Sequence, residues 1–213
     1  MKIAIQQNAK VLAMFAIACT AMVGIVNYLT KDTIARQEEQ QLLDTLHQVI
    51  APDRLNNDLY HDCQFITDSD LLGSANSQTA YVARMDNIPV AVAITTVAPD
   101  GYNGNINLLV AINADGTLSG VRVLKHKETP GLGDKIEIRK ADWIYSFDGK
   151  FIDGEKDLRW AVKKDGGMFD QFTGATITPR AVVNAVHNAL LYFNAHKDEI
   201  VTNTTSCRDI SND

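Results

Sequence analysis

A run of twenty residues without a charged side chain, Val11 to Thr30, constrains the fold of this chain more than any other feature. At about 1.5 Å per residue, a helix of this length spans the roughly 30 Å hydrocarbon layer of a membrane. Lys31 and Asp32 end the run. We therefore expect one transmembrane helix over residues 11–30, after a short tail of residues 1–10.

Cleavage of this segment is the alternative. A signal peptide requires a short apolar region and a cleavage site of the small-x-small type. The stretch from Ala16 to Cys19 is similar to a lipoprotein cleavage box, but its first position is alanine rather than leucine. The apolar run also continues past Cys19 to Val26, which favours an uncleaved anchor.

The charges on either side of the segment predict its orientation. The tail before it carries only positive groups, namely Lys2, Lys10 and the amino terminus, whereas the residues after it mix both signs. Positively charged flanks stay on the cytoplasmic side of a membrane. The sequence thus predicts a cytoplasmic tail, a single membrane span and an exported remainder.

The exported part has the pattern of an α+β domain. A neck helix is expected at residues 31–52, because apolar residues recur at helical spacing until Pro52. The main domain follows at residues 53–200. Short apolar runs between turn residues predict a short strand at Cys63–Thr67 and an antiparallel sheet of four strands in two hairpins, at Thr79–Met85, Val90–Val97, Ile106–Ile112 and Leu118–Lys125. Asp86–Pro89 and Asn113–Gly116 are hairpin signals within it.

Helices are expected to flank this sheet. The spacing of apolar residues predicts helices at Lys135–Phe147 and Pro179–His196, with a further strand at Arg159–Lys163 between them. The tail of residues 201–213 is polar from Asn203 onward and is expected to be loose. The net charge of −6 argues against a nucleic-acid partner.

Three threonines stand where the last helix is expected to begin. Thr173, Thr176 and Thr178 lie within six residues, and Thr178 precedes Pro179 as an N-cap residue precedes a proline at the first helical position. Free N–H groups and the positive end of the helix dipole make such a place an anion site. We expect a phosphate there, with Thr173 and Thr178 as hydrogen-bond donors. The alternative is an ordinary turn that caps a helix.

The stretch Asp170-Gln-Phe-Thr-Gly-Ala-Thr176 resembles the motif on which a family of proteins carries covalent flavin mononucleotide (FMN). In that family a flavin transferase takes FMN from FAD and joins its phosphate to the last threonine as an ester. The resemblance implies that Thr176 is the acceptor and that Gly174 and Ala175 belong to the binding turn. It also implies that Asp170 assists the transferase.

A second segment, His126-Lys-Glu-Thr-Pro-Gly-Leu-Gly133, resembles the other signature of this FMN-binding domain. Its glycines let the backbone approach a flat ring closely. Backbone amides and Thr129 are expected to bond the polar edge of the flavin, with His126, Glu128 and Leu132 around it. His126 and Glu128 alternate, so on a strand they would share a face. No other histidine has ligand spacing to them, and we expect no metal.

Together these features cover nearly the whole chain and resemble most closely the G subunit of Rnf-type electron transport complexes. The resemblance implies an assembly in the bacterial inner membrane that passes electrons between ferredoxin and NAD and couples this to ion movement. The chain would be its electron-carrying flavoprotein subunit, with the main domain in the periplasm and no catalytic residue of its own. Its partners would be the other membrane subunits and, during maturation, the flavin transferase.

Other assignments remain open at this point. The C subunit of sodium-translocating NADH–quinone reductase shares both motifs, but its longer extramembrane part fits this compact chain less well. A membrane-anchored module with noncovalent flavin is a second possibility. A hydrolase or transferase with Thr176 as nucleophile is a third, although no base pairs with it by spacing.

The three cysteines, Cys19, Cys63 and Cys207, form no CxxC pair. Zinc, iron–sulfur or haem attachment is therefore not expected. Cys63 and Cys207 both fall in the exported part, and exported compartments permit disulfides. We predict a bridge between them that ties the tail to the start of the sheet. The alternative is two free, half-buried thiols.

Overall fold

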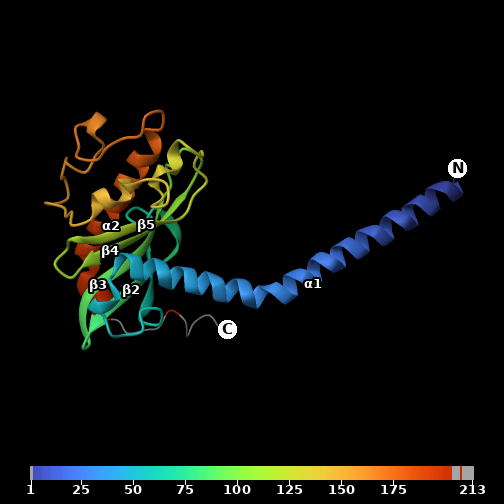
Figure 1. Cartoon of the computed structure of the whole chain (residues 1–213), viewed down its shortest axis with the longest axis horizontal. Helices are drawn as coiled ribbons and strands as arrows, with labels where there is room; N and C mark the ends of the chain where they lie inside the picture. The colour runs from blue at the N-terminus through green and yellow to red at the C-terminus, as the bar shows by residue number, and fades with distance from the viewer. Residues whose placement is uncertain (1, 203–206, 208–213) are drawn as a thin grey trace. The chain divides into compact units, whose positions relative to one another are not determined.

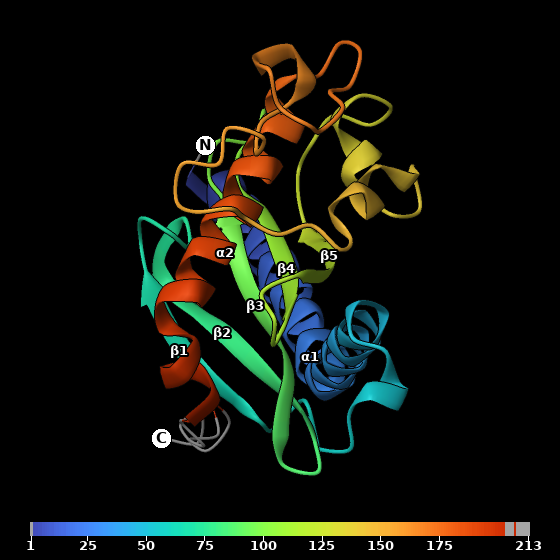
Figure 2. The same ribbon diagram turned by 90° about the vertical axis from the view of Figure 1, so that its left-hand side faces the viewer.

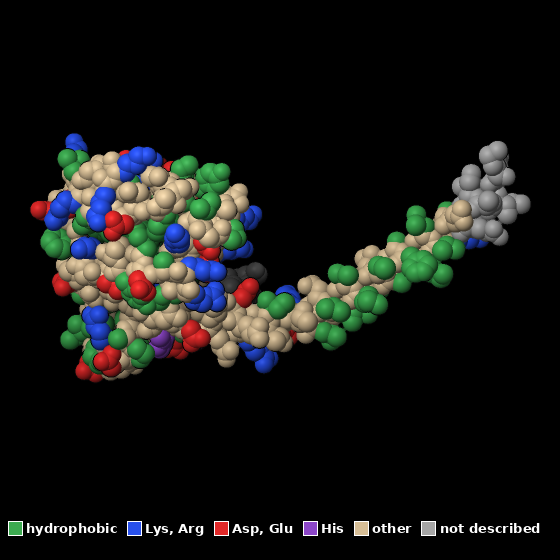
Figure 3. Space-filling model, turned by 45° about the horizontal axis from the view of Figure 1, so that its top comes forward, with side chains coloured by type: hydrophobic (Ala, Val, Ile, Leu, Met, Phe, Trp, Pro, Cys, Tyr) green, Lys and Arg blue, Asp and Glu red, His purple; other side chains and the backbone are tan. Residues whose placement is uncertain are grey.

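The computed structural model describes residues 2–202 and residue 207, in two units that divide after Asp44. The first unit belongs to helix α1 (Lys2–Val49), which runs without interruption (Figure 1). Its large apolar side chains, from Val11 to Ile34, are exposed and line the helix in Figure 3. By length and composition, this helix is able to cross a membrane.

The second unit begins with the last turn of α1. The helix ends at Val49, and Pro52 then opens a short 3-10 turn, η1 (Pro52–Arg54). A proline has no N–H to donate and fits the first turn of a helix. Of the expected tail, residues 201 and 202 are helical and Cys207 is described, whereas residues 203–206 and 208–213 lie outside the described residues.

A five-stranded antiparallel sheet forms the centre of the second unit (Figures 1 and 2). Its spatial order follows the chain, so every strand pairs with the next one. The strands are β1 (Cys63–Asp68), β2 (Ser74–Met85), β3 (Ile88–Ala98), β4 (Ile106–Asn113) and β5 (Leu118–Lys125). All five predicted strands are confirmed, and β2 begins earlier than expected.

Two of the turns between strands explain why local sequence predicts this sheet well. Asp86 and Asn87 connect β2 to β3 as a two-residue turn, and both have positive φ, at 52° and 65°. Asparagine and aspartate tolerate this left-handed conformation better than other non-glycine residues. Gly116, with φ 88°, does the same between β4 and β5.

The core lies between one face of the sheet and helix α2 (Ile177–Thr202), which crosses the strands in Figure 2. Alternate residues of each strand point into it, as the two-residue period of a strand requires. The opposite face meets the end of α1, where Val49 would contact any Cβ added at Gly120 and where Arg122 donates to the Gln48 carbonyl. The sheet is thus covered on both faces.

The segment between β5 and α2 contains no regular strand in the described structure. It packs through an aromatic cluster of Trp143, Phe147, Trp160, Phe169 and Phe172, in which the rings of Phe147 and Phe169 stack with centroids 4.5 Å apart. Aromatic pairs of this kind add stability beyond the area they bury. The cluster holds an irregular segment against the core.

The prediction of one helix at Lys135–Phe147 is wrong. Two 3-10 helices, η2 (Gly133–Ile136) and η3 (Asp142–Phe147), replace it, with a turn in between. The turn forms because the Glu137 carbonyl accepts N–H bonds from Lys140 and Ala141. Burial of Ile136 in η2 and of Phe147 in η3 fixes each piece separately.

The predicted strand at Arg159–Lys163 is also wrong. The chain there folds back on itself through η4 (Lys163–Asp165), and a single bridge joins Val162 to Phe169. Gly166 takes φ 88° at the reversal. The reversal supplies the backbone hydrogen bonds that a strand would need from a sheet, for example from Met168 N to Arg159 O at 2.9 Å.

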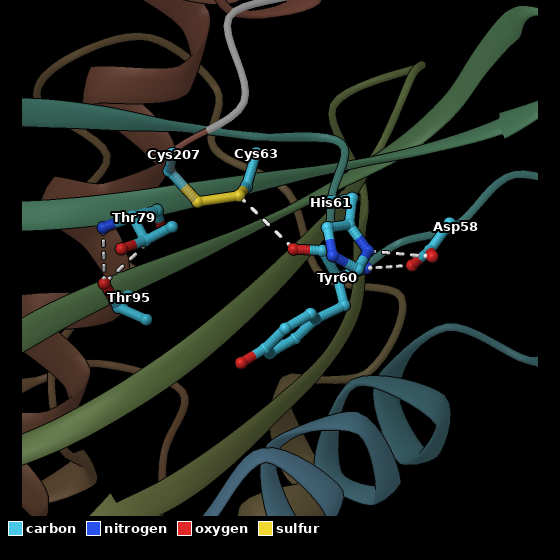
Figure 4. The surroundings of a disulfide bond; sticks show 7 residues. All are labelled: Asp58, Tyr60, His61, Cys63, Thr79, Thr95 and Cys207. Atoms are coloured by element: carbon cyan, nitrogen blue, oxygen red, sulfur yellow. Dashed lines mark hydrogen bonds and ion pairs between the residues drawn. A yellow bond between two sulfur atoms is a disulfide. The ribbon is translucent and has the colours of Figure 1, made fainter. Parts of the chain in front are cut away.

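A disulfide joins Cys63 at the start of β1 to Cys207 beyond the end of α2 (Figure 4). The two Cα atoms are 5.3 Å apart, and the Cys207 N–H donates to the Cys63 carbonyl at 3.0 Å. Both cysteines are buried. The bridge ties the chain that follows α2 to the edge strand of the sheet.

Candidate functional site

A pocket of about 260 Å³ lies at the amino-terminal end of α2. Three stretches far apart in sequence meet there: the loop after β3, the loop after β5, and the turn that leads into α2. Its walls are formed by Tyr102, Glu128, Thr129, Leu132, Gly133, Gly174, Ala175, Thr176, Ile177 and Thr178. The structure therefore brings the two sequence signatures together.

Thr176 precedes the first residue of α2, Ile177, and thus stands at the N-cap position. The Arg180 N–H reaches the Thr176 carbonyl at 3.4 Å. The predicted start, with Thr178 as N-cap and Pro179 as first residue, is wrong by two positions. The correction places Thr176 directly before the first N–H groups of the helix, which have no partner within it.

Thr178 has a different role from the one expected. Its side chain is fully buried, and its hydroxyl donates a short hydrogen bond to Glu128 Oε2. Glu128 is 5% exposed, and its Oε1 accepts from the Asn103 N–H at 3.1 Å. Since β5 ends at Lys125, His126 and Glu128 lie in a loop, and the expectation of a shared strand face is wrong.

Three of the proposed site residues do not line the pocket. His126 supports the loop from behind, since Nε2 lies 2.7 Å from Glu137 Oε1 and Nδ1 accepts from the Glu128 N–H. The Asp170 carboxylate pairs with Lys163 at 2.6 Å. Thr173 is exposed and directly precedes Gly174, the first residue of this turn that lines the pocket.

Tyr102 and Ile177 line the pocket although the sequence motifs do not predict them as site residues. Both are exposed large side chains, at 67% and 46%. Tyr102 belongs to the Ala-Pro-Asp-Gly-Tyr stretch between β3 and β4, whose resemblance to the pattern of the FMN-binding family is the sequence signal for it. With Leu132 they give the mouth of the pocket an apolar rim.

Glycines keep the pocket open at two points. A Cβ at Gly133 would lie 2.8 Å from Glu128 Oε2 and 2.9 Å from Thr178 Oγ1, closer than packing allows. Gly174 has φ 83°, which side chains other than glycine rarely adopt. Any larger residue at Gly133 would fill the space next to the Glu128 carboxylate and the Thr178 hydroxyl at the start of α2.

Two cations close in sequence to the start of α2, Lys163 and Arg180, are paired with carboxylates. Arg180, in the first turn of α2, binds Asp165 through two hydrogen bonds of 2.7 and 3.0 Å. These bonds lower the pKa of Asp165 below its ordinary value. Among the described residues that line the pocket, none is a lysine or an arginine.

The chemistry of a hydrolase gains no support from this geometry. A threonine nucleophile needs an adjacent base. In the described part of the chain no hydrogen bond joins the Thr176 hydroxyl to a histidine or a carboxylate, and the Glu128 oxygens are bonded to Thr178 and Asn103. Nor do the described residues gather three or more potential metal ligands.

In comparison with known proteins, two family models match separate parts of the chain. Residues 101–191 match the FMN-binding domain, and residues 1–49 match the RnfG N-terminal region. The chain is 52% identical over 207 residues to the G subunit of the ion-translocating oxidoreductase complex from Shewanella loihica, covering 97% of this chain and 98% of the relative.

Relatives in other genera carry the same name. The G subunits from Aliivibrio fischeri strain MJ11 and Vibrio atlanticus are 48% and 49% identical, over 95% and 96% of this chain and 96% and 97% of their own lengths. Similarity of this extent covers the apolar helix, the sheet and the pocket alike. The chain therefore belongs to the family of G subunits of ion-translocating oxidoreductase complexes.

Proposed function

We propose that this protein is the electron-carrying subunit of a membrane-bound, ion-translocating oxidoreductase complex, with FMN joined through its phosphate to the Thr176 hydroxyl. The observation that carries the proposal is the position of Thr176 in a pocket at the start of α2. The phosphoester formed with Thr176 would carry a single negative charge, whereas a free phosphate monoester carries about −1.5 to −2 at neutral pH.

The residues of the pocket fit a flavin. Thr176 offers a hydroxyl for the phosphate, while Tyr102, Leu132 and Ile177 offer an apolar rim for a flat ring. The cradle at Gly133 leaves room that a Cβ would close. The Thr129 hydroxyl is the donor that this loop offers to the polar edge of the ring, because the N–H groups of Leu132 and Gly133 already donate to the Thr129 carbonyl.

The lining charges favour a covalent link over a noncovalent one. Many proteins that bind phosphate groups reversibly use arginine or lysine as counter-charges. The pocket lining contains neither, and Arg180 and Lys163 are paired with Asp165 and Asp170. An ester to Thr176 needs no such counter-charge, which is why we place the membrane-anchored module with noncovalent flavin second.

When bound, FMN supplies one- or two-electron transfer. The chain's own share is to hold and orient it. Thr176 fixes one end, α2 fixes Thr176, and the loop from Glu128 to Gly133 forms the facing wall. The other subunits of the complex are the source and destination of the electrons, in keeping with the ferredoxin and NAD pair that the family resemblance implies.

Attachment requires an outside enzyme. A flavin transferase would use FAD, so that Thr176 Oγ forms the new bond to the flavin-side phosphorus while AMP leaves and the hydroxyl proton is released. The turn at Thr173 and Gly174 is exposed, which gives such an enzyme access. Asp170, exposed beside the turn, is the residue available for recognition.

The membrane topology follows from charge and from the disulfide. Residues 11–30 form the proposed anchor and residues 31–52 the neck, with the tail of residues 1–10 in the cytoplasm because its charges are positive. The FMN-binding domain, residues 53–200, and the tail of residues 201–213 lie in the periplasm. The Cys63–Cys207 bridge supports this side of the inner membrane, since cytosolic thiols stay reduced.

Intact mass of the full-length chain, produced with and without the transferase, tests the proposal. We expect an increase of one FMN minus one water, mapped to the peptide that contains Thr176. Thr176→Val should abolish the increase, whereas Thr173→Val, the matched change at an exposed hydroxyl of the same turn, should keep it. Modified Thr176→Val protein, or unmodified wild type, would refute the assignment.

A further inference from the structure

Glu128 is a buried carboxylate in the wall of the same pocket. One oxygen accepts from the Thr178 hydroxyl and the other from the Asn103 N–H. In the described part of the chain it forms no ion pair with lysine, arginine or histidine. Both of its oxygens therefore act as acceptors of hydrogen bonds from within the chain.

The surrounding backbone prevents this carboxylate from turning away. A Cβ at Gly101 would lie 3.0 Å from Oε1, and one at Gly133 would lie 2.8 Å from Oε2. The Glu128 N–H donates to His126 Nδ1 at 3.0 Å, and His126 is held by Glu137. Contacts from within the chain itself therefore hold the Glu128 carboxylate at the wall of the pocket.

The Glu128 carboxylate also lies at the start of α2, where an anion would interact with the positive end of the helix dipole. Thr178, which bonds it, is the second residue of α2. The positive end of a helix dipole is equivalent to roughly half an elementary charge. One carboxylate more than offsets that charge, so a second anion in this pocket meets no net attraction from the helix.

We propose that Glu128 excludes flavin held only by its free phosphate, so that the pocket accepts FMN as the Thr176 ester and not as a dissociable ligand. A free phosphate monoester carries a charge of about −1.5 to −2 at neutral pH, whereas the diester formed with Thr176 carries one negative charge. The like charge of Glu128 therefore penalises the free monoester more strongly. This inference rests on the proposed FMN site at Thr176.

The test uses full-length protein from cells without the flavin transferase, in which Thr176 is unmodified. FMN and riboflavin, which differ by the phosphate alone, are titrated against the wild type and Glu128→Gln. We expect the wild type to bind riboflavin more tightly than FMN. Glu128→Gln should bind FMN at least about tenfold more tightly than the wild type, with riboflavin affinity changed less than about twofold.

Glu155→Gln is the matched control. It removes an equal charge from an exposed position that does not line the pocket. We expect it to leave the ratio of FMN to riboflavin affinity unchanged. A gain in FMN affinity equal to that of Glu128→Gln would overturn the inference, because the effect would then come from the net charge of the protein.

Two further outcomes would overturn it: wild-type protein that binds FMN more tightly than riboflavin, or a Glu128→Gln affinity for FMN no higher than that of wild type. The wild-type comparison stands even if the variant does not fold. Failure of the proposed function is a separate result, since it appears as missing FMN on Thr176 after treatment with transferase and FAD.

Discussion

The disulfide between Cys63 and Cys207 allows a quantitative test of what holds α2 in place. We predict that the double substitution Cys63→Ala and Cys207→Ala lowers the free energy of unfolding by about 3–5 kcal/mol. The bridge joins positions 144 residues apart. Its loss frees the chain end beyond α2, while the pocket at the other end of the helix keeps its contacts.

The magnitude comes from the length of the closed loop. The chain-entropy relation gives about 5 kcal/mol for a loop of this size at 25 °C, and measured losses of native bridges are typically about 2–5 kcal/mol. The hydrogen bond from the Cys207 N–H to the Cys63 carbonyl adds about 1 kcal/mol if it is lost as well. Native strain and residual denatured structure reduce the total.

Urea unfolding followed by tryptophan fluorescence measures this loss. Trp143 and Trp160 belong to the aromatic cluster and report on unfolding of the core. The slope of the unfolding free energy against urea concentration is expected to be steeper in the double variant. Without the cross-link, its denatured state exposes more surface. Cys19→Ala, which removes an exposed thiol outside the bridge, should unfold like the wild type.

Two results would refute the reasoning. One is a double variant whose unfolding free energy lies within about 1 kcal/mol of the wild-type value, since the loop term alone exceeds that. The other is a wild type whose urea midpoint does not change on reduction. Loss of flavin attachment in a variant that still folds would show that the bridge acts on the pocket itself.

Three other predictions each concern a substitution at a single position. Burial lowers the pKa of His187 from its ordinary value near 6.5, so the unfolded chain binds the extra proton and stability falls as pH drops below 6.5; His187→Leu should flatten the melting temperature between pH 5 and 7. Gly133→Ala crowds Glu128, and we expect about 1–3 kcal/mol of destabilisation in urea and less attached flavin by intact mass. Gly167→Ala places a Cβ 2.0 Å from a carbonyl oxygen and should cost more than about 3 kcal/mol by the same urea assay, whereas Gly154→Ala, with open space, should cost about 1 kcal/mol.

The parts of the fold that local sequence predicts are those fixed by local interactions. The turn at Asp86 and Asn87 needs residues that accept positive φ, and such residues are visible in the sequence. The face of α2 shows the helical period because one stripe of it is buried. The strand expected at Arg159–Lys163 fails for the opposite reason, since apolar content does not reveal whether a sheet edge is available.

The candidate site also has features that the sequence predicts and features that it does not. Thr176 and the loop from Glu128 to Gly133 follow from motifs, but the bond from Thr178 to Glu128 spans 50 residues and no spacing rule predicts it. Sequence reasoning misplaces the start of α2 because a proline at its third position looks like one at its first. It misses Tyr102 because exposure of an aromatic residue is decided by tertiary structure.

The pairing of each strand with its immediate successor has a consequence for assembly. A polypeptide that emerges from a membrane amino-terminal end first adds strands one at a time to a growing edge, and no strand waits for a distant partner. The candidate pocket forms later, because its last wall is supplied by residues that arrive when the sheet is already complete. Under the proposed function, attachment of the flavin therefore waits until the domain has finished folding.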